Sequence, residues 1–237
     1  MTRAELLYGV AAAGANVLGA VAVVSRARWS LRALDQVLSL AAGFLISVTV
    51  LDLFPEAIAR GGERAAFVAL GAYLLVHLSQ HTLGRHFHFG EETHEVSEVV
   101  SISALIGLLL HTFVDGVAVA SGIRVSASLG AMVFVAVLLH KFPEGLAISS
   151  LFLAAGAGKS RALLAAGALG AATILGIVLT DQFAPLQTNG LAIAAGVTMY
   201  VGASNLVPEF QAKRGWSIPG TFLLGCGLYL LARSLAR

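Results

Sequence analysis

The sequence predicts an all-α membrane protein that crosses the lipid bilayer several times. Three observations predict this class: hydrophobic residues make up 57% of the 237 residues, charged residues make up only 12%, and long apolar stretches follow one another along the chain. Soluble domains carry about 25% charged residues, so this chain has too little charge to cover a water-facing surface. The same shortage excludes a disordered chain, which needs high charge and low hydrophobicity.

Other classes of protein are excluded by simple counts. The single cysteine, Cys226, excludes an intrachain disulfide and a cysteine-rich zinc site. The net charge of +2 is too small to indicate a nucleic-acid partner. Chains that span lipid must satisfy their backbone hydrogen bonds internally, and the strict alternation of a β-barrel is absent, so we expect helices. We therefore predict one transmembrane domain over residues 1–237, with membrane lipid around it.

Eight stretches are long and apolar enough to cross a bilayer, which takes about 20 helical residues. They cover residues 4–24, 34–55, 65–84, 98–122, 126–155, 161–181, 188–208 and 216–234. The first stretch is longer than the apolar core of a secretory signal, so we interpret it as a span. The 26 glycines and many alanines allow the helices to approach one another closely.

The second span ends in a motif that the seventh span repeats. Residues 41–56 read AAGFLISVTVLDLFPE and residues 194–209 read AAGVTMYVGASNLVPE, with seven of sixteen positions identical. The copies are offset by five spans, an odd number, so they cross the membrane in opposite directions. Asp52 lies a turn inside the second span and is a candidate metal ligand. For Glu56 and Glu209, a carboxylate stabilised by water at the membrane surface is the alternative.

The third and fourth spans are joined by a loop, residues 85–97, that is rich in histidine and glutamate. Metal sensing or delivery by His86, His88 and His94 is one interpretation. A solvated loop without metal is the other.

The fourth and fifth spans carry a second repeat that contains rare residues. Residues 111–121 read HTFVDGVAVAS and residues 140–150 read HKFPEGLAISS. In both, a histidine precedes a carboxylate by four residues, which places the two side chains on one helix face. Inverted repeats around a polar site near the membrane midplane are typical of secondary transporters. Chance similarity between helices rich in small residues is the alternative.

Two such helices facing each other would gather two imidazoles and two carboxylates around one point. These residues are His111, Asp115, His140 and Glu144. Ionisable groups inside a membrane are costly and face a cavity or a partner, and imidazole with carboxylate suits Zn²⁺, Fe²⁺, Mn²⁺ or Ni²⁺. We therefore predict a divalent-metal site. A buried network that only holds the helices together is the alternative.

The residue after each histidine extends the candidate site. Thr112 lies three residues before Asp115, so its hydroxyl can face the same cavity. Lys141 lies inside an apolar span. We expect its ammonium to pair with Asp115 or Glu144 and to occupy the space of a second cation. Snorkelling of the side chain to the membrane surface is the alternative.

The motifs HTFVDG and HKFPEG, with the paired ends DLFPE and NLVPE, resemble those of the ZIP family of divalent-metal transporters, bacterial type. The resemblance covers essentially the whole chain. It implies eight helices in a 3+2+3 inverted arrangement, external termini and a cytoplasmic His-rich loop. It also implies a transporter rather than an enzyme, with the divalent cation as its cargo and no cofactor.

The resemblance implies a primary site and a secondary site. The primary ligands by position are His111, Asp115, His140 and Glu144. The secondary site would use Thr112, Asp115, Lys141 and Glu144. Here Thr112 replaces the usual Asn, Lys141 stands where a ligand is needed, and the sixth span lacks a mid-helix carboxylate. We therefore predict a single metal per pore.

The count of cationic residues favours the orientation that the resemblance implies, with external termini. The side of the termini carries six cationic residues: Arg3, Arg60, Arg64, Arg124, Arg233 and Arg237. The other side carries eight, and cytoplasmic loops hold the excess of positive charge.

The predicted function is transport of divalent metal cations across the bacterial inner membrane into the cytoplasm, by alternating access at the site between the fourth and fifth spans. Zinc is the favoured cation, with iron, manganese and cadmium as alternatives. The oligomeric state stays open, with a homodimer as one alternative. An intramembrane zinc-dependent hydrolase and a structural or sensory protein are the competing interpretations.

Overall fold

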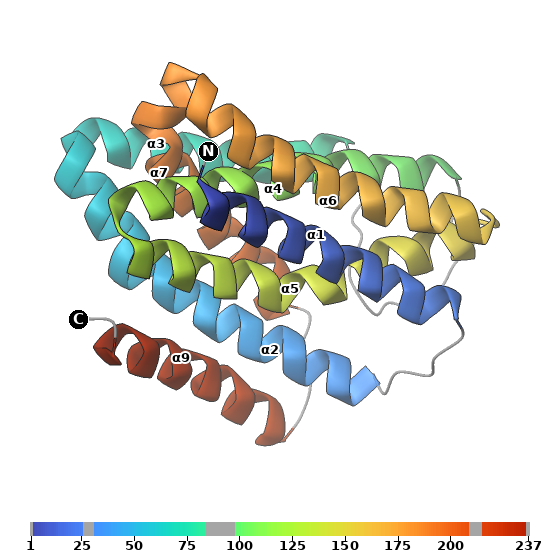
Figure 1. Cartoon of the computed structure of the whole chain (residues 1–237). Helices are drawn as coiled ribbons and strands as arrows, with labels where there is room; N and C mark the ends of the chain where they lie inside the picture. The colour runs from blue at the N-terminus through green and yellow to red at the C-terminus, as the bar shows by residue number, and fades with distance from the viewer. Residues whose placement is uncertain (1, 26–30, 84–97, 209–214, 236–237) are drawn as a thin grey trace.

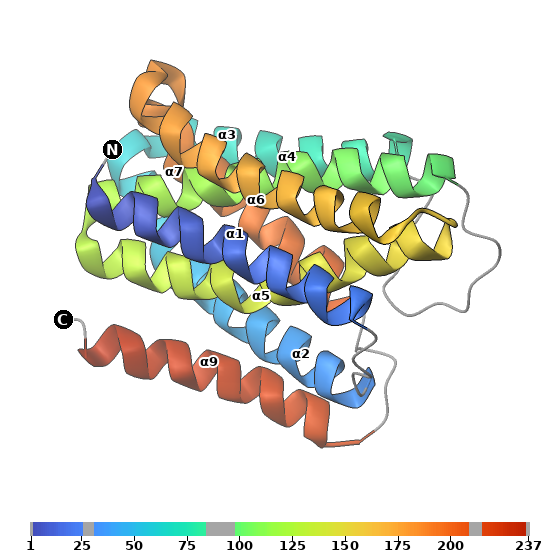
Figure 2. The same ribbon diagram turned by 45° about the vertical axis from the view of Figure 1, so that its right-hand side comes forward.

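The computed structural model describes residues 2–25, 31–83, 98–208 and 215–235 and contains only helices in these ranges. In chain order they are α1 (Arg3–Val24), α2 (Leu31–Val48), η1 (Thr49–Leu53), α3 (Phe54–Leu83), α4 (Glu98–Val125), α5 (Ala127–Ala154), α6 (Lys159–Gln182), α7 (Ala184–Met199), η2 (Tyr200–Leu206) and α9 (Ser217–Leu235). The two short elements η1 and η2 are π-helices. The start of α1 and the end of α9 lie at the same end of the bundle (Figures 1 and 2).

Six helices in the described ranges are long and apolar enough to cross a membrane. They differ from the eight predicted spans in two places. The elements α2, η1 and α3 follow one another directly, so two predicted spans fall in one stretch of 45 residues, Asp35–Ser79. In addition, α7 has only 16 residues, which is short for a span, before the chain continues as η2.

The long stretch is interrupted at Gly62, where φ is 57° and ψ is −149°. This backbone conformation is essentially restricted to glycine. A straight helix of 45 residues would be about 68 Å long, more than twice the hydrocarbon thickness of about 30 Å. Figure 1 shows instead that the ribbon turns sharply within α3.

The helices pack in two groups (Figures 1 and 2). The first group is α1, α4, α5 and α6, while in the second α2 packs on α9 and α3 packs on α7. Contacts of α4 with α7 and of α2 with α5 join the groups. This pairing agrees with the repeat that relates α4 to α5. Helix α4 packs on α6, and its repeat mate α5 packs on α1 in the corresponding way.

Glycines make the closest helix contacts. A Cβ on Gly145 of α5 would overlap the backbone of Asn16 in α1, and a Cβ on Gly19 of α1 would overlap the backbone of Phe142 in α5. Helices α4 and α6 meet through glycines in the same reciprocal way, as do α2 and α9. Small residues at helix crossings allow backbones to touch, which is how membrane helices gain packing energy without a hydrophobic driving force.

The π-helical turns occur at matching places in the first repeat. Both η1 and η2 end just before a Pro-Glu pair of the sequence. Asp52 in η1 and Asn205 in η2 hold equivalent positions. The repeated sequence therefore carries a repeated backbone irregularity. Single π-turns inside α-helices often occur at functional sites.

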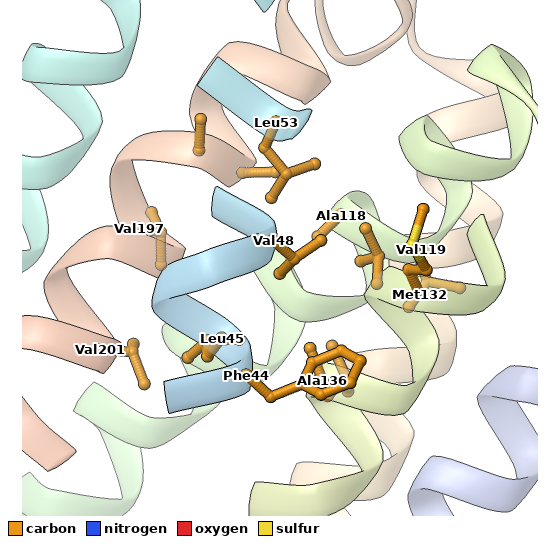
Figure 3. Close-up of a cluster of buried hydrophobic side chains, with 14 of the residues drawn as sticks. Phe44, Leu45, Val48, Leu53, Ala118, Val119, Met132, Ala136, Val197 and Val201 are labelled. Atoms are coloured by element: carbon orange, nitrogen blue, oxygen red, sulfur yellow. The ribbon is translucent and has the colours of Figure 1, made fainter. Parts of the chain in front are cut away.

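An apolar core fills the space where α2, α4, α5 and the α7–η2 helix meet (Figure 3). Its buried side chains include Phe44, Val48, Val119, Met132 and Val201. The outer surface is apolar too, with Phe67, Leu75 and Leu164 each about two-thirds exposed, at 66%, 69% and 71%. Exposed apolar surface of this kind is what lipid covers.

Candidate metal centre

The four histidine and carboxylate residues of α4 and α5 come together inside the bundle. His111, Asp115, His140 and Glu144 each offer one ligand atom, and these atoms lie within 4.8 Å of one another. All four side chains are buried. Gly116 and Gly145, the residues after the carboxylates, face α6 and α1. Each carboxylate precedes its glycine by one position and therefore lies about 100° away from it around the helix. Its ligand atom lies within 4.8 Å of the ligand atoms of the other helix.

Three donor atoms already have the spacing of a metal coordination shell. Nε2 of His111 lies 3.4 Å from Asp115 Oδ2, and Nε2 of His140 lies 3.3 Å from the same oxygen. Two ligands of a tetrahedral zinc ion, each about 2.0–2.1 Å from the metal, are about 3.3 Å apart. The arrangement of these atoms therefore fits one small divalent cation.

A backbone carbonyl orients the His140 ring. Nδ1 of His140 lies 2.9 Å from the Ala136 carbonyl oxygen, which can only accept a hydrogen bond, so Nδ1 carries a proton. In the neutral ring Nε2 then presents its lone pair to the cluster. Hydrogen bonds of this type fix the ring orientation of metal-binding histidines.

Lys141 is fully buried and joins the two carboxylates. Its Nζ donates to Asp115 Oδ2 at 2.6 Å and to Glu144 Oε2 at 2.7 Å. The side chain is 0% exposed, so it does not snorkel to the membrane surface, and the expected ion pair is present. With neutral imidazoles, two carboxylates and one ammonium give the cluster a net charge of −1.

Several buried polar atoms of α1, α4 and α5 lack a hydrogen-bond partner within the described ranges. They are Nδ1 of His111, Oε1 of Glu144 and both amide atoms of Asn16. An unpartnered acceptor in a dry interior costs about 1–3 kcal/mol, so Glu144 Oε1 is well placed to receive a cation. Asn16 was missed by the sequence reasoning. The available signal was an amide residue standing alone in the apolar first span.

The remaining predicted site residues differ in position. Thr112 is buried beside the cluster, and its hydroxyl donates to the Leu109 carbonyl at 3.1 Å, which leaves lone pairs on its oxygen. Asp52 is not part of the cluster. It accepts hydrogen bonds from the Tyr229 hydroxyl and from Arg233 Nε, the latter at 3.0 Å. His86, His88 and His94 lie outside the described residues.

Comparison with known proteins identifies one family. The model of the ZIP zinc transporter family matches residues 76–232, about two-thirds of the chain, and this range includes all four residues of the cluster. None of the curated proteins compared with the chain matches it.

Proposed function

This chain belongs to the ZIP zinc transporter family, and from that premise we propose that it carries zinc into the cytoplasm through the cluster of His111, Asp115, His140 and Glu144. The family transports divalent metals, so the ion is a substrate rather than a cofactor, and the chain is a multi-pass membrane protein. Iron, manganese and cadmium suit the same mixed nitrogen and oxygen donors and are the alternative cargoes.

The observation that carries the proposal is the convergence of four buried donor atoms from two helices. A divalent ion that leaves water needs replacement ligands and compensating negative charge. The imidazoles supply nitrogen ligands, and Asp115 and Glu144 supply both oxygen ligands and charge. Glu144 has the larger expected effect because its Oε1 is buried without a partner.

We propose that one metal ion binds per pore. The ammonium of Lys141 lies between Asp115 and Glu144, where a second cation would share these two carboxylates. Thr112 is proposed as a weaker ligand at the edge of the cluster. Asp52 is proposed as a separate weak ligand outside the cluster, near the end of the second span.

Transport requires a change of shape because the four side chains of the cluster are buried. Ala118 and Val119 follow Asp115 by one turn, and Met132 and Ala136 precede His140 by one to two turns. All four are buried in the apolar core (Figure 3). We propose that these side chains close the route from the end of the bundle where α4 ends and α5 begins. We propose that the α1–α4–α5–α6 group rocks or slides against the other helices, which gives alternating access.

We also propose that the chain crosses a bacterial inner membrane eight times in a 3+2+3 inverted arrangement, with external termini. The break at Gly62, the extension of α7 by η2 and the matched helix pairs support eight spans. The excess of cationic residues on the opposite side supports the orientation. An intramembrane hydrolase is not favoured, because the family consists of transporters.

Zinc flux into proteoliposomes tests the proposed function. Wild type should transport zinc, and Glu144→Ala should lose transport while it still inserts and folds, since Lys141 keeps its ion pair with Asp115. Glu98→Ala is the matched control, because Glu98 is an exposed carboxylate at the start of α4. Undiminished flux in Glu144→Ala would refute the assigned site. Zinc binding without flux in wild type would favour a hydrolase or a structural role.

A further inference from the structure

The structure has a second polar feature, a pocket of about 220 Å³ that is separate from the metal cluster. Its walls come from α3 near Gly61, from the last turns of α4, and from the first turns of α7. These positions lie at helix ends, beside the Gly62 break. A pocket at this level of a membrane protein is within reach of water and of lipid headgroups.

The charged residues that line this pocket are all arginines in the described ranges. Arg60, Arg64 and Arg124 line it together with Ser121 and Asn189, and within the described ranges no Asp or Glu does. Isolated arginines at a surface are ordinary, but three that converge on one hollow repel one another. Their convergence therefore favours an anion between them.

Most of the guanidinium donors remain available. Arg60 uses Nε on Glu56 at 2.6 Å, and Arg124 uses Nη2 on Asp181 at 2.7 Å. Arg64 makes no hydrogen bond or ion pair in the part of the chain that the structure describes. Each guanidinium has five N–H groups, so the three side chains keep many donors for a ligand. The positive end of the α7 dipole and the negative end of the α4 dipole oppose each other here. Because Glu56 and Asp181 pair with Arg60 and Arg124, the unbalanced positive charge is that of Arg64.

We propose that this pocket binds a phosphate-class anion. Arginine forks match the tetrahedral oxygens of phosphate and form paired, charge-assisted hydrogen bonds to them. A volume of 220 Å³ holds several water molecules at about 30 Å³ each, and therefore also a phosphate group. The anion is either free phosphate or the headgroup of an anionic lipid, and it would tie α3 and α7 of one helix group to α4 of the other.

Two binding measurements on the full chain, made without metal, distinguish the two sources. In nanodiscs of phosphatidylcholine, the melting temperature is followed during titration with inorganic phosphate at constant ionic strength. In nanodiscs that contain phosphatidylglycerol, native mass spectrometry counts the anionic lipids that stay bound. Arg64→Gln removes an exposed guanidinium without leaving a carboxylate unpaired. Arg3→Gln, at the exposed start of α1, is the control for the same loss of charge.

Saturable binding in one of the two measurements is the expected result. Arg64→Gln should weaken it about tenfold, because a hydrogen bond to a charged group contributes about 1.5 kcal/mol, and Arg3→Gln should leave it unchanged. Binding of phosphate identifies the free anion, and retention of phosphatidylglycerol alone identifies the lipid. If wild type binds neither, or if both variants weaken binding equally, the pocket is not an anion site.

Discussion

Replacing Lys141 with methionine is expected to tighten zinc binding, because it removes a positive charge from beside the metal. Nζ of Lys141 lies 2.6 Å from Asp115 Oδ2. A zinc ion bound to that oxygen at about 2.0–2.2 Å would be at most about 4.8 Å from Nζ. Methionine has nearly the same length as lysine and no charge, so packing is retained.

Coulomb's law sets the magnitude. Charges of +1 and +2 at about 4.8 Å repel by about 1.7 kcal/mol even at the dielectric constant of water, and by about four times more at the effective value of about 20 for protein sites. The smaller figure corresponds to about a twentyfold lower Kd. Lys141→Met should therefore bind zinc at least about twentyfold more tightly, still with one ion per chain because the neutral thioether of methionine supplies no charge to balance a second divalent cation.

The same replacement should destabilise the metal-free protein. Asp115 and Glu144 would lose their shared ammonium, and breaking a buried ion pair typically costs about 3–5 kcal/mol. Zinc should restore the stability, because two carboxylates balance one divalent cation. The melting temperature should therefore rise more with zinc in the variant than in wild type.

Isothermal titration calorimetry with zinc, together with melting curves, measures both effects. Lys159→Met is the matched control, since Lys159 is exposed at the start of α6, and it should behave as wild type. A folded Lys141→Met protein that binds zinc no more tightly than wild type would refute the assignment of Lys141 as a competing charge in the site.

Three further substitutions test the fold around the site. Gly145→Ala would drive a methyl group into the backbone of α1 and should destabilise the protein by about 3 kcal/mol. Gly167→Ala is the control and should leave the melting temperature unchanged, because no atom lies near its Cβ. Equal effects of the two substitutions would contradict the close contact. Gly62→Ala should cost about 1–3 kcal/mol because of the positive φ, and a neutral outcome would show that the chain does not bend there. Asp52→Asn weakens the ion pair with Arg233 and should lower the free energy of unfolding by about 1 kcal/mol, while the zinc affinity of the cluster stays unchanged. A large loss of zinc affinity would place Asp52 in the site.

The central part of the site could be predicted because its signal is local. A histidine and a carboxylate four residues apart share a helix face whatever the rest of the fold does, and the motif occurs in both α4 and α5. Lys141 lies three residues before Glu144, so a pairing of its ammonium with Glu144 or with the facing Asp115 was predictable as well, and both pairs are present.

Contacts between distant segments could not be predicted in this way. Asp52 reaches Arg233 across 181 positions of sequence, and no spacing rule connects an aspartate near the end of one span with an arginine in the last. The gap expected between the second and third spans does contain a break, at Gly62, but the sequence does not show that helix extends to within one residue of it on both sides. Amphipathic periodicity gives little help where lipid and protein interior are equally apolar.

The position of bound zinc tests the central claim, a single divalent-metal site between α4 and α5, most directly. Anomalous X-ray diffraction from zinc-loaded crystals should show one strong peak, about 2.0–2.2 Å from ligand atoms of His111, Asp115, His140 and Glu144. No peak between α4 and α5, or two fully occupied peaks there, would contradict it.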